Sequence, residues 1–404
     1  MLLKISWRNI WRNKLRSGVV IIALVIGLWA ALFMSAFSWG LYQGHIDDTI
    51  ETYLSHLQIH HPMYLTEKTP EYTIPNSTDV IRLIRNDTRV IASSARVLVS
   101  GMITSPKSVS GVMICGINPQ DEFSVSTVSH QVVEGSALRE GKKHEVFIGS
   151  KLAEKLNVKV KSKIVLTFQS VNRDMTAGSF RICGIFKTHN SIFDETTIFV
   201  HDTILAEMLG SEDAVHEIAV LLKDEADSDT LRTFLNRKFP EIQAKTWKDL
   251  SPELRLVIES FNEYMLIFIG IILLALMFGI INTMLMAVLE RQREIGMLMA
   301  IGLNKKNIFI MIVTETLLLV CIGIPIGLLI TYLSVTYFHT YGIDISIFSQ
   351  GLSAWGFRSR VYTYLNYNFY IPVILLTILC ALISSIYPAY RALQYRPSEA
   401  IRKI

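Results

Sequence analysis

Four long stretches without a charged side chain constrain the fold of this 404-residue chain more than any other feature. They cover residues 18–44, 264–289, 316–343 and 361–390, and none contains Asp, Glu, Lys or Arg. A helix needs about 20 apolar residues to cross a hydrocarbon core of about 30 Å, whereas an apolar run of about 10–14 is more typical of a buried helix in a soluble protein. All four stretches exceed the longer requirement. The sequence therefore predicts an α-helical membrane protein with four transmembrane helices.

The distribution of charge predicts the orientation of these helices. The segments 1–16, 290–307 and 391–404 are rich in Lys and Arg, and four spans would place all three on one side of the membrane. Acidic residues outnumber basic ones in 45–262. By the positive-inside rule, both termini are expected in the cytoplasm and residues 45–262 in the periplasm, outside a bacterial inner membrane. The net charge of +4 arises from this asymmetry, so it gives no indication of nucleic-acid binding.

The expected organisation follows from the spans. In chain order we expect an amphipathic elbow helix (1–16), the first span (17–44), a large α+β domain (45–262), the second span (263–289), a cytoplasmic amphipathic helix (290–307), the third span (308–338), an extracytoplasmic loop (339–366), the fourth span (367–390) and a cytoplasmic tail (391–404). The first span is too long for the apolar part of a cleaved signal peptide, which has about 7–15 residues, so we expect a retained anchor.

The segment 45–262 alternates strand and helix patterns. Strands are expected at 57–60, 95–104, 111–117, 145–148, 163–168, 179–186, 198–200, 218–222 and 242–245, and helices at 78–89, 149–157 and 229–238. Its length is sufficient for two subdomains, which we expect to divide as 80–95 with 215–245 against 96–212. Cys115 and Cys183 would lie in an oxidising compartment, which leaves a disulfide between them open.

Motifs that carry chemistry are missing from the sequence. It has no G-x-x-x-x-G-K-[ST] loop, no H-E-x-x-H and no G-x-S-x-G, so we expect no catalytic residues and no cofactor on this chain. On a strand, His56 and His60 would share one face, but without a carboxylate partner a solvated face is favoured over a metal site.

The segment between the second and third spans is the most informative one. It begins with the alternating charges Glu290, Arg291, Arg293 and Glu294 and continues with a stripe of Met, Leu and Ile. This pattern predicts a short amphipathic helix lying against the membrane. Glu315, about two turns into the third span, is expected to face the membrane interface or to pair with Arg293 or Lys306 rather than to take part in transport.

The run E-R-Q-R-E-I-G-M-L-M-A-I-G at 290–302 resembles the signature loop of the FtsX/MacB/LolE-type ABC permeases. The resemblance continues through Glu315, Gly323 and Gly327 into the tail, at Pro388, Ala389, Arg391, Ala392, Pro397, Glu399, Ala400 and Arg402. The runs at 116–119, 132–135, 148–156 and 181–188 are similar to the periplasmic core of the same family.

This resemblance implies a transport subunit rather than an enzyme. Such permeases work as a pair, with a second copy or a homologue, and each holds one of two ATPase subunits that carry ATP and Mg. The chain starts at the elbow helix, so the ATPase is expected to be a separate chain. The residues expected to couple to it are Glu290, Arg291, Arg293, Glu294, Ile295, Gly296 and Leu298.

The resemblance also limits the choice of substrate. Release of lipoproteins from the membrane to a periplasmic carrier is favoured, with membrane lipids as the surroundings. Export of a peptide, drug or other amphiphile, or signalling to a cell-wall hydrolase, are the alternatives. The turn 169–178 is short and lacks proline, which argues against carrier binding by this chain. An acyl chain would enter a cleft lined by Leu28, Phe33, Phe37, Trp39, Met265 and Phe268.

Overall fold

The computed structural model describes residues 2–142, 144–211, 213–364 and 369–395. The expected tail beyond residue 395, with Arg396, Pro397, Glu399, Ala400, Arg402 and Lys403, lies outside the described residues, as does the predicted start of the fourth span at 367–368. The chain divides into two compact units. A helical unit holds the residues up to Leu41 together with 258–344 and those from Arg360 onward, and an α+β unit holds Tyr42–Val257 and Ile345–Ser359.

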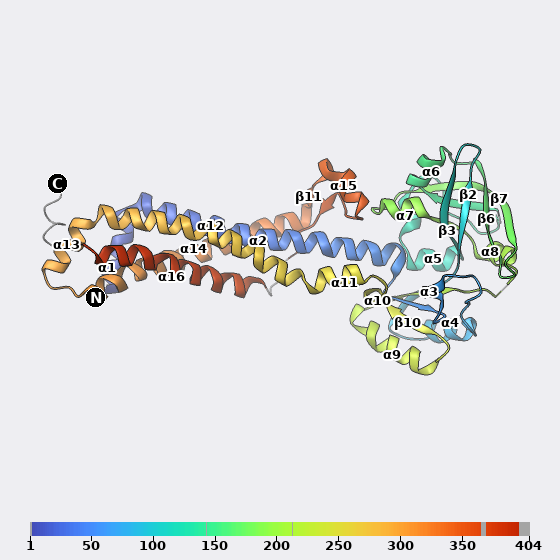
Figure 1. Cartoon of the computed structure of the whole chain (residues 1–404), viewed down its shortest axis with the longest axis horizontal. Coiled ribbons are helices and arrows are strands. Elements are labelled where there is room, and N and C mark those ends of the chain that lie inside the picture. Colours follow the sequence, from blue (N-terminus) through green and yellow to red (C-terminus); the bar gives the residue numbers. More distant parts are fainter. Residues whose placement is uncertain (1, 143, 212, 365–368, 396–404) are drawn as a thin grey trace. The chain divides into compact units, whose positions relative to one another are not determined.

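Four helices of the described chain are long and apolar enough to cross a membrane, which confirms the predicted fold class. They are α2 (Lys14–Thr49), α12 (Phe261–Glu290), α14 (Lys305–Tyr341) and α16 (Tyr370–Leu393), and Figure 1 shows them as the longest ribbons. Helix α16 packs against both α12 and α14. Helix α2 continues into a π-helical turn, Ile50–Leu54, before the first strand begins.

Small residues let α14 approach α2 closely. A Cβ atom at Gly323 would lie 3.2 Å from Cβ of Leu24, and one at Gly327 would lie 3.0 Å from Cδ2 of Leu28. Pro325 lies between these glycines and α14 continues through it. The two glycines therefore serve helix packing, as a small-xxx-small pattern predicts.

The elbow helix is shorter than the expected 1–16. Helix α1 (Leu2–Arg12) ends before Asn13, and Lys14 and Arg16 already belong to α2. Its buried side carries Ser6, whose hydroxyl donates to the carbonyl oxygen of Met311 in α14 at 3.2 Å. Trp7 and Trp11 are exposed on the other side, 5.9 Å apart between ring centroids. An apolar, tryptophan-rich face of this kind is typical of a helix in a membrane interface.

Six strands of the α+β unit form a closed ring. Its order is β2 (Val90–Thr104), β3 (Val109–Ile117), β8 (Thr197–His201), β5 (Glu145–Gly149), β7 (Met175–Phe186) and β6 (Lys163–Gln169), and β6 returns to pair with β2. A short strand, β4 (Val132–Gly135), adds to β7. Alternate residues point inward, as Ile164, Leu166 and Phe168 do in β6, and form one buried core.

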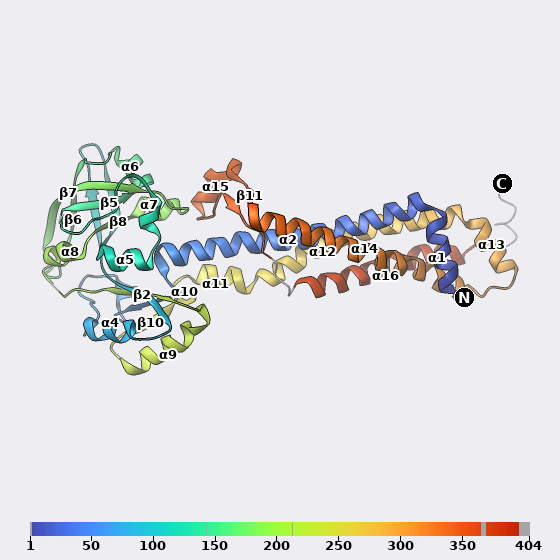
Figure 2. The same ribbon diagram turned by 180° about the vertical axis from the view of Figure 1, so that it is seen from behind.

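The other strands form a second layer with two helices on one face. The sheet order β10 (Gln243–Thr246), β1 (Leu57–His60), β9 (Glu217–Leu222) and β2 is antiparallel throughout. Helices α4 (Ser77–Arg85) and α9 (Ser228–Lys238) contribute Val80, Ile84, Leu231 and Leu235 to its core. Figure 2 shows these two helices from behind, on the side of β10.

The expected split into two subdomains is only partly matched. Besides the ring core and the core of the second layer, a third buried cluster contains Cys115, Phe147 and Phe199. Residues 57–84 join the core of the second layer. Strand β2 belongs to both the ring core and the second-layer core, because its first half pairs with β9 and its second half with β3 and β6. Every expected strand is present; β1 has the expected bounds, and each of the others is shifted at one or both ends. The expected turn 169–178 is shorter, since β6 and β7 pair as far as Gln169 and Met175.

The positions and number of the helices differ more from the expectation than those of the strands do. Helix α4 ends at Arg85 rather than at residue 89, and α6 (Ser150–Leu156) begins after Gly149. Short helices that were not expected include α5 (Pro119–Val125), α7 (Ser191–Thr196) and α8 (Asp202–Leu209). Asn118 and Asn190 cap α5 and α7 through their side chains, so the Asn-Pro pair at 118–119 was a usable signal.

Other short helices were also not expected. Helix α3 (Tyr64–Glu67) follows β1, and α10 (Trp247–Leu250) and α11 (Pro252–Glu259) precede α12. The expected loop 339–366 holds β11 (Ile343–Asp344), α15 (Ser349–Ala354) and β12 (Arg360–Val361).

A disulfide between Cys115 and Cys183 is excluded. The two residues lie in β3 and β7, three strands apart in either direction around the ring, and both are free thiols. With neighbouring strands about 4.8 Å apart, opposite strands of a six-membered ring lie about 10 Å apart, whereas bridged cysteines have Cα atoms about 4.4–6.8 Å apart.

Candidate functional site

The signature run lies where five helices meet. Helix α12 ends at Glu290, Arg291 follows as its cap, and α13 (Gln292–Ala300) begins at once. After the turn at Gly302, Asn304 caps α14 by accepting from the backbone N–H of Lys306. Helix α1 packs across α14 and places its own polar residues beside this junction.

Three ion pairs connect the junction to other helices. Arg16 of α2 pairs with Glu290, Arg12 of α1 pairs with Glu294, and Arg291 pairs with Glu315 of α14 at 3.3 Å. Three of the four charges that open the signature run are therefore bound within the chain. The sequence alone instead predicts that Arg291 and Glu294 contact the ATPase.

Glu315 is the most buried member of this network, with 7% of its surface exposed. It accepts a hydrogen bond from Nδ2 of Asn9 at 2.6 Å, and Arg291 in turn donates to the carbonyl oxygen of Asn9 at 2.8 Å. A buried carboxylate is tolerated when it is both paired and hydrogen-bonded. The expected pairing with Arg293 or Lys306 is wrong, because Glu315 pairs with Arg291 instead and Arg293 is exposed.

Helix α13 has a buried and an exposed side. Ile295 and Gly296 are buried, and Leu298 is half-buried. Met297 and Ile301 are 54% and 78% exposed. Arg293 is exposed too, and no ion pair is recorded for it among the described residues. The Met/Leu stripe thus does not sit wholly against the membrane helices as expected, because residues 293, 297 and 301 share a face at helical spacing.

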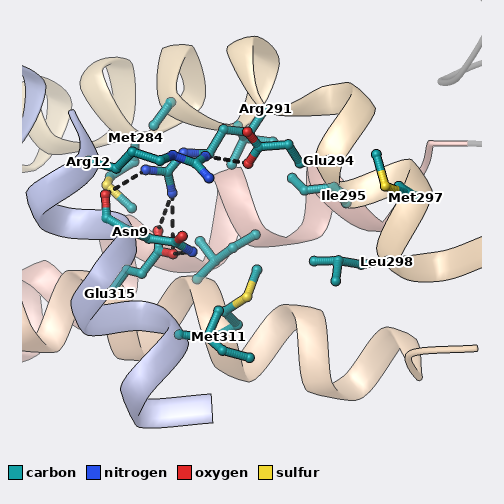
Figure 3. Close-up of a pocket in the computed structure, with 14 residues that line it drawn as sticks. Asn9, Arg12, Met284, Arg291, Glu294, Ile295, Met297, Leu298, Met311 and Glu315 are labelled. Atoms are coloured by element: carbon teal, nitrogen blue, oxygen red, sulfur yellow. Dashed lines mark hydrogen bonds and ion pairs between the residues drawn. The ribbon is translucent and has the colours of Figure 1, made fainter. Parts of the chain in front are cut away.

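A cavity of about 330 Å³ lies inside this junction, between α1, α12, α13 and α14. Figure 3 shows side chains of these elements around it, with Arg12, Arg291 and Glu294 on one side and Leu298 and Met311 on the other. The Asn9, Arg291 and Glu315 group closes part of its wall.

The residues expected to line a substrate cleft are not equivalent. Leu28 and Met265 are buried within the helical unit, at 0% and 5% exposure, so they present no surface in this conformation. Phe33 stacks on Trp29 at 5.2 Å and Trp39 meets Phe261 edge-on at 5.0 Å.

The other two cleft residues keep more of their surface. Phe37 is half-buried, and Phe268 is the one member of the six that is largely exposed, at 49%. Four of the six residues therefore remain candidates for lining the substrate cleft: Phe33, Phe37, Trp39 and Phe268.

The histidines of β1 do not form a solvated face. His60 is 1% exposed, and its Nδ1 and Nε2 atoms lie 3.1 Å from the carbonyl oxygen of His216 and 3.0 Å from Oε1 of Gln58. Burial lowers the pKa of His60. No group of three or more metal-ligating side chains occurs among the described residues.

A buried ion cluster beside His60 was not foreseen. Arg96 of β2 donates to both oxygens of Glu122 at 2.8 and 2.6 Å and to Glu217 at 2.5 Å. It also donates to the carbonyl oxygen of Tyr53, which the π-helical turn leaves free. Burial would raise the pKa of Glu122, but the charge and hydrogen bonds of Arg96 outweigh it and lower that pKa. The end of α2 is thereby joined to the strand shared by both cores.

Two family descriptions match the chain in succession. Residues 17–237 match the MacB-like periplasmic core domain, and residues 266–397 match the FtsX-like permease C-terminal region.

Individual relatives are distant. An uncharacterised ABC transporter permease of Methanocaldococcus jannaschii is 24% identical over 68% of this chain, which spans 66% of that relative's length. The lipoprotein-releasing system transmembrane protein LolE of Haemophilus influenzae is 21% identical over 98% of both chains. The macrolide export ATP-binding/permease protein MacB of Escherichia coli is 26% identical over 42% of this chain and 28% of its own.

The resemblance in the signature run is thus confirmed over most of the chain. The core-domain match alone covers more than half of it, and the permease match adds the last three long helices. The chain belongs to the FtsX/MacB/LolE-type permeases of ABC transporters and is a multi-pass membrane protein.

Proposed function

We propose that this permease acts with a separate ATPase subunit, in two copies, to draw lipid-anchored proteins out of the outer leaflet of the bacterial inner membrane. The observation that carries this proposal is the match to a lipoprotein-releasing permease over 98% of both chains. The 404 residues hold no phosphate-binding G-x-x-x-x-G-K-[ST] loop, so ATP and Mg belong to the partner. A second copy of the chain, or a homologue, completes the transporter.

The proposal places the α+β unit in the periplasm and both termini in the cytoplasm. The support is the excess of Lys and Arg around α1 and α13 and the excess of acidic residues in 45–262. Helix α13 then lies on the ATPase side of the membrane.

The exposed face of α13 is the proposed docking surface for the ATPase. It consists of Arg293, Met297, Ala300 and Ile301, and Lys305 is exposed just beyond it. Apolar side chains flanked by cations fit a groove with an apolar floor and an acidic rim.

The opening charges of the signature run have a different role in this proposal. Glu290, Arg291 and Glu294 bind Arg16, Glu315 and Arg12, which lie in α2, α14 and α1. Glu294 and the capping Arg291 connect α13 to α1 and α14, and Glu290 connects the adjoining end of α12 to α2, so a displacement of α13 by the ATPase would act on these helices as well. Because α2 continues into the α+β unit and α12 follows that unit directly in the chain, the movement would reach the periplasm without a substrate path across the bilayer.

A lipid anchor needs an apolar surface that is open to the bilayer. Moving an acyl chain out of lipid costs about 0.8 kcal/mol per CH₂, so a polar channel would not accept it. Phe268 and Tyr264 are exposed near the start of α12, and Phe33 and Phe37 are half-buried in α2. These aromatic residues supply the proposed entry surface.

Carrier binding is assigned to a homologous partner permease rather than to any copy of this chain. The hairpin between β6 and β7 has only Ser170–Asp174 outside the paired strands. Such a short turn offers little surface to a soluble protein.

Release of a labelled lipoprotein from proteoliposomes tests the proposal. The assay contains the permease, its partner ATPase, ATP and a soluble carrier. Phe268→Asp should stop release, since a charge on the entry surface opposes an acyl chain. Ile267→Asp is the matched control, because Ile267 is 61% exposed at the same depth but points elsewhere on α12. Equal loss in both variants would argue against an entry surface at Phe268.

Export of an amphiphile is the second candidate, favoured by the match to the macrolide exporter. If the unmodified complex releases no acylated protein but raises drug resistance in cells, export replaces lipoprotein release.

A further inference from the structure

The cavity inside the helix junction has an apolar floor built by four elements. Its floor includes Ile5 of α1, Ala287 and Val288 of α12, Leu298 of α13 and Met311 and Ile312 of α14. Its volume of about 330 Å³ is at the lower end of the range for small-molecule sites, about 300–1,000 Å³. A wall of aliphatic and thioether groups suits an alkyl chain and offers nothing to a polar ligand.

The polar wall of the cavity has two ion pairs of different accessibility. In the deeper pair, the side chains of Arg291 and Glu315 are 15% and 10% exposed, and Asn9 completes the hydrogen bonds of Glu315. In the outer pair, the side chains of Arg12 and Glu294 are 52% and 49% exposed. The deeper pair is satisfied, so only the outer pair can receive a ligand's polar group.

The outer pair offers one cation and one anion side by side. An anionic headgroup would meet Glu294 as well as Arg12, and a cationic one would meet Arg12 as well as Glu294. A zwitterionic headgroup satisfies both, with its phosphate at Arg12 and its ammonium at Glu294.

The location of the cavity makes such a ligand abundant. Helix α1 forms one side of it and carries the exposed Trp7 and Trp11, which favour the headgroup region of a membrane. The cavity would then open at the depth where phospholipid headgroups and the first part of their chains lie.

We propose that this cavity binds one alkyl chain of a phosphatidylethanolamine molecule of the inner leaflet, with its headgroup on Arg12 and Glu294. The bound chain packs α13 against α12 and α14 and fixes the helix that carries the exposed face. Lipid binding rests on the membrane position of α1. Its effect on ATPase coupling rests in addition on the proposed function.

Photocrosslinking tests the binding directly. The full-length permease is reconstituted in vesicles of phosphatidylethanolamine and phosphatidylglycerol that contain phosphatidylethanolamine with a diazirine in its acyl chain. Mass spectrometry should locate crosslinks at residues 284–288, 295–298 and 311–312. Crosslinks confined to lipid-facing residues such as Leu274 and Phe278, which are 54% and 62% exposed, would overturn the proposal.

Filling the cavity should remove the crosslinks within it. Leu298→Phe should lower them about tenfold, the effect of an overpacked site. Met299→Phe is the control, because Met299 is the next residue of α13 and does not line this cavity. Ala287→Leu fills the same space from α12 and gives a second reading if Leu298→Phe does not fold. Crosslinking that survives Ala287→Leu would contradict the proposal.

The headgroup assignment has its own test. Glu294→Gln removes the partner of the ammonium and leaves Arg12, so a diazirine phosphatidylglycerol should then label the cavity better than the phosphatidylethanolamine does. An unchanged preference would overturn the headgroup assignment.

Adding the partner ATPase tests whether a lipid or the ATPase occupies the cavity. If it abolishes cavity labelling in the unmodified chain, the cavity is a pocket for an ATPase side chain and the lipid proposal fails. These readouts require no transport, so they are independent of the lipoprotein assay.

Discussion

Arg358 binds Asp48 through two hydrogen bonds, from Nη2 to Oδ1 at 2.5 Å and from Nε to Oδ2 at 2.6 Å, although the two residues lie 310 positions apart. Next to them, Nδ1 of His45 lies 2.8 Å from the carbonyl oxygen of Gly356, a glycine with φ of +77°. The segment Ile345–Ser359, which connects α14 to α16, is thereby fastened to the continuation of α2 inside the α+β unit.

Removing the Arg358–Asp48 ion pair should destabilise the segment 345–359. Arg358→Gln leaves Asp48, which is 8% exposed, without its charge partner, and we expect a loss of about 2–4 kcal/mol, somewhat below a fully buried pair. Hydrogen exchange of residues 345–359 should rise strongly. Arg360→Gln, an exposed cation in β12, is the control. The double variant with Asp48→Asn should lose no more than Arg358→Gln does, and independent additive losses would contradict the pairing.

The buried pair of Arg291 and Glu315 should be required for folding rather than for docking. Arg291→Met leaves a buried carboxylate unpaired, which costs about 3–5 kcal/mol. Thermal unfolding of the purified chain in detergent should shift clearly downward. Adding Glu315→Leu should restore most of the stability, because the unpaired charge is gone. A double variant as unstable as Arg291→Met would show that the pair is not the cause.

The exposed face of α13 should behave in the opposite way. Arg293→Glu and Met297→Asp change side chains that other parts of the described chain do not bury, so thermal stability should stay within about 0.5 kcal/mol. Co-purification with the ATPase and stimulated ATP hydrolysis should fall at least about tenfold, as expected for the centre of an interface. Normal stimulation in both variants would remove this face from the docking surface.

Stability of the α+β unit should fall in mild acid. Burial lowers the pKa of His216, whose Nδ1 accepts from the backbone N–H of Leu98 while Nε2 faces the carbonyl oxygen of Pro70. Only the neutral ring fits these bonds. A folded-state pKa below the ordinary value of about 6.5 means that the native state binds fewer protons, so stability falls as pH drops below about 6.5.

The size of this effect is limited and measurable. One such histidine contributes at most about 1.4 kcal/mol per pH unit. The melting temperature of the full chain, measured between pH 7.5 and 5.5, should show the slope. His216→Asn keeps one acceptor and one donor without titrating, and should flatten it. His130→Asn, at an exposed position, should not.

The orientation can be tested by thiol labelling of a cysteine-free chain. The exposed Glu140 is a suitable site in the α+β unit. Glu140→Cys should react with a membrane-impermeant reagent in spheroplasts, and Lys305→Cys should react only after lysis. The reverse result would invert the membrane topology and with it the assignment of α13 to the ATPase side.

The sequence by itself determined the spans, the membrane class, the family and most strands. Apolar runs such as 264–289 need a hydrocarbon environment whatever they pack against. This requirement can be recognised from a continuous stretch of sequence alone. The alternation of Ile164, Leu166 and Phe168 likewise predicts a half-buried strand without any knowledge of its neighbours. The short helices were missed because a segment such as Ser191–Thr196 is too brief to show a period.

Which side chains pair with one another within the chain was decided only by the tertiary structure. The signature run shows that Arg291 and Glu294 are charged and close to a membrane, but their partners Glu315 and Arg12 lie on helices that meet them only after the bundle has packed. The same holds for the closed ring that separates Cys115 from Cys183 and for the burial of Met265. Local periodicity tells which side chains must be covered or paired. What covers or pairs them depends on contacts between segments far apart in the chain, and those are fixed by how the helices and strands fit together in space.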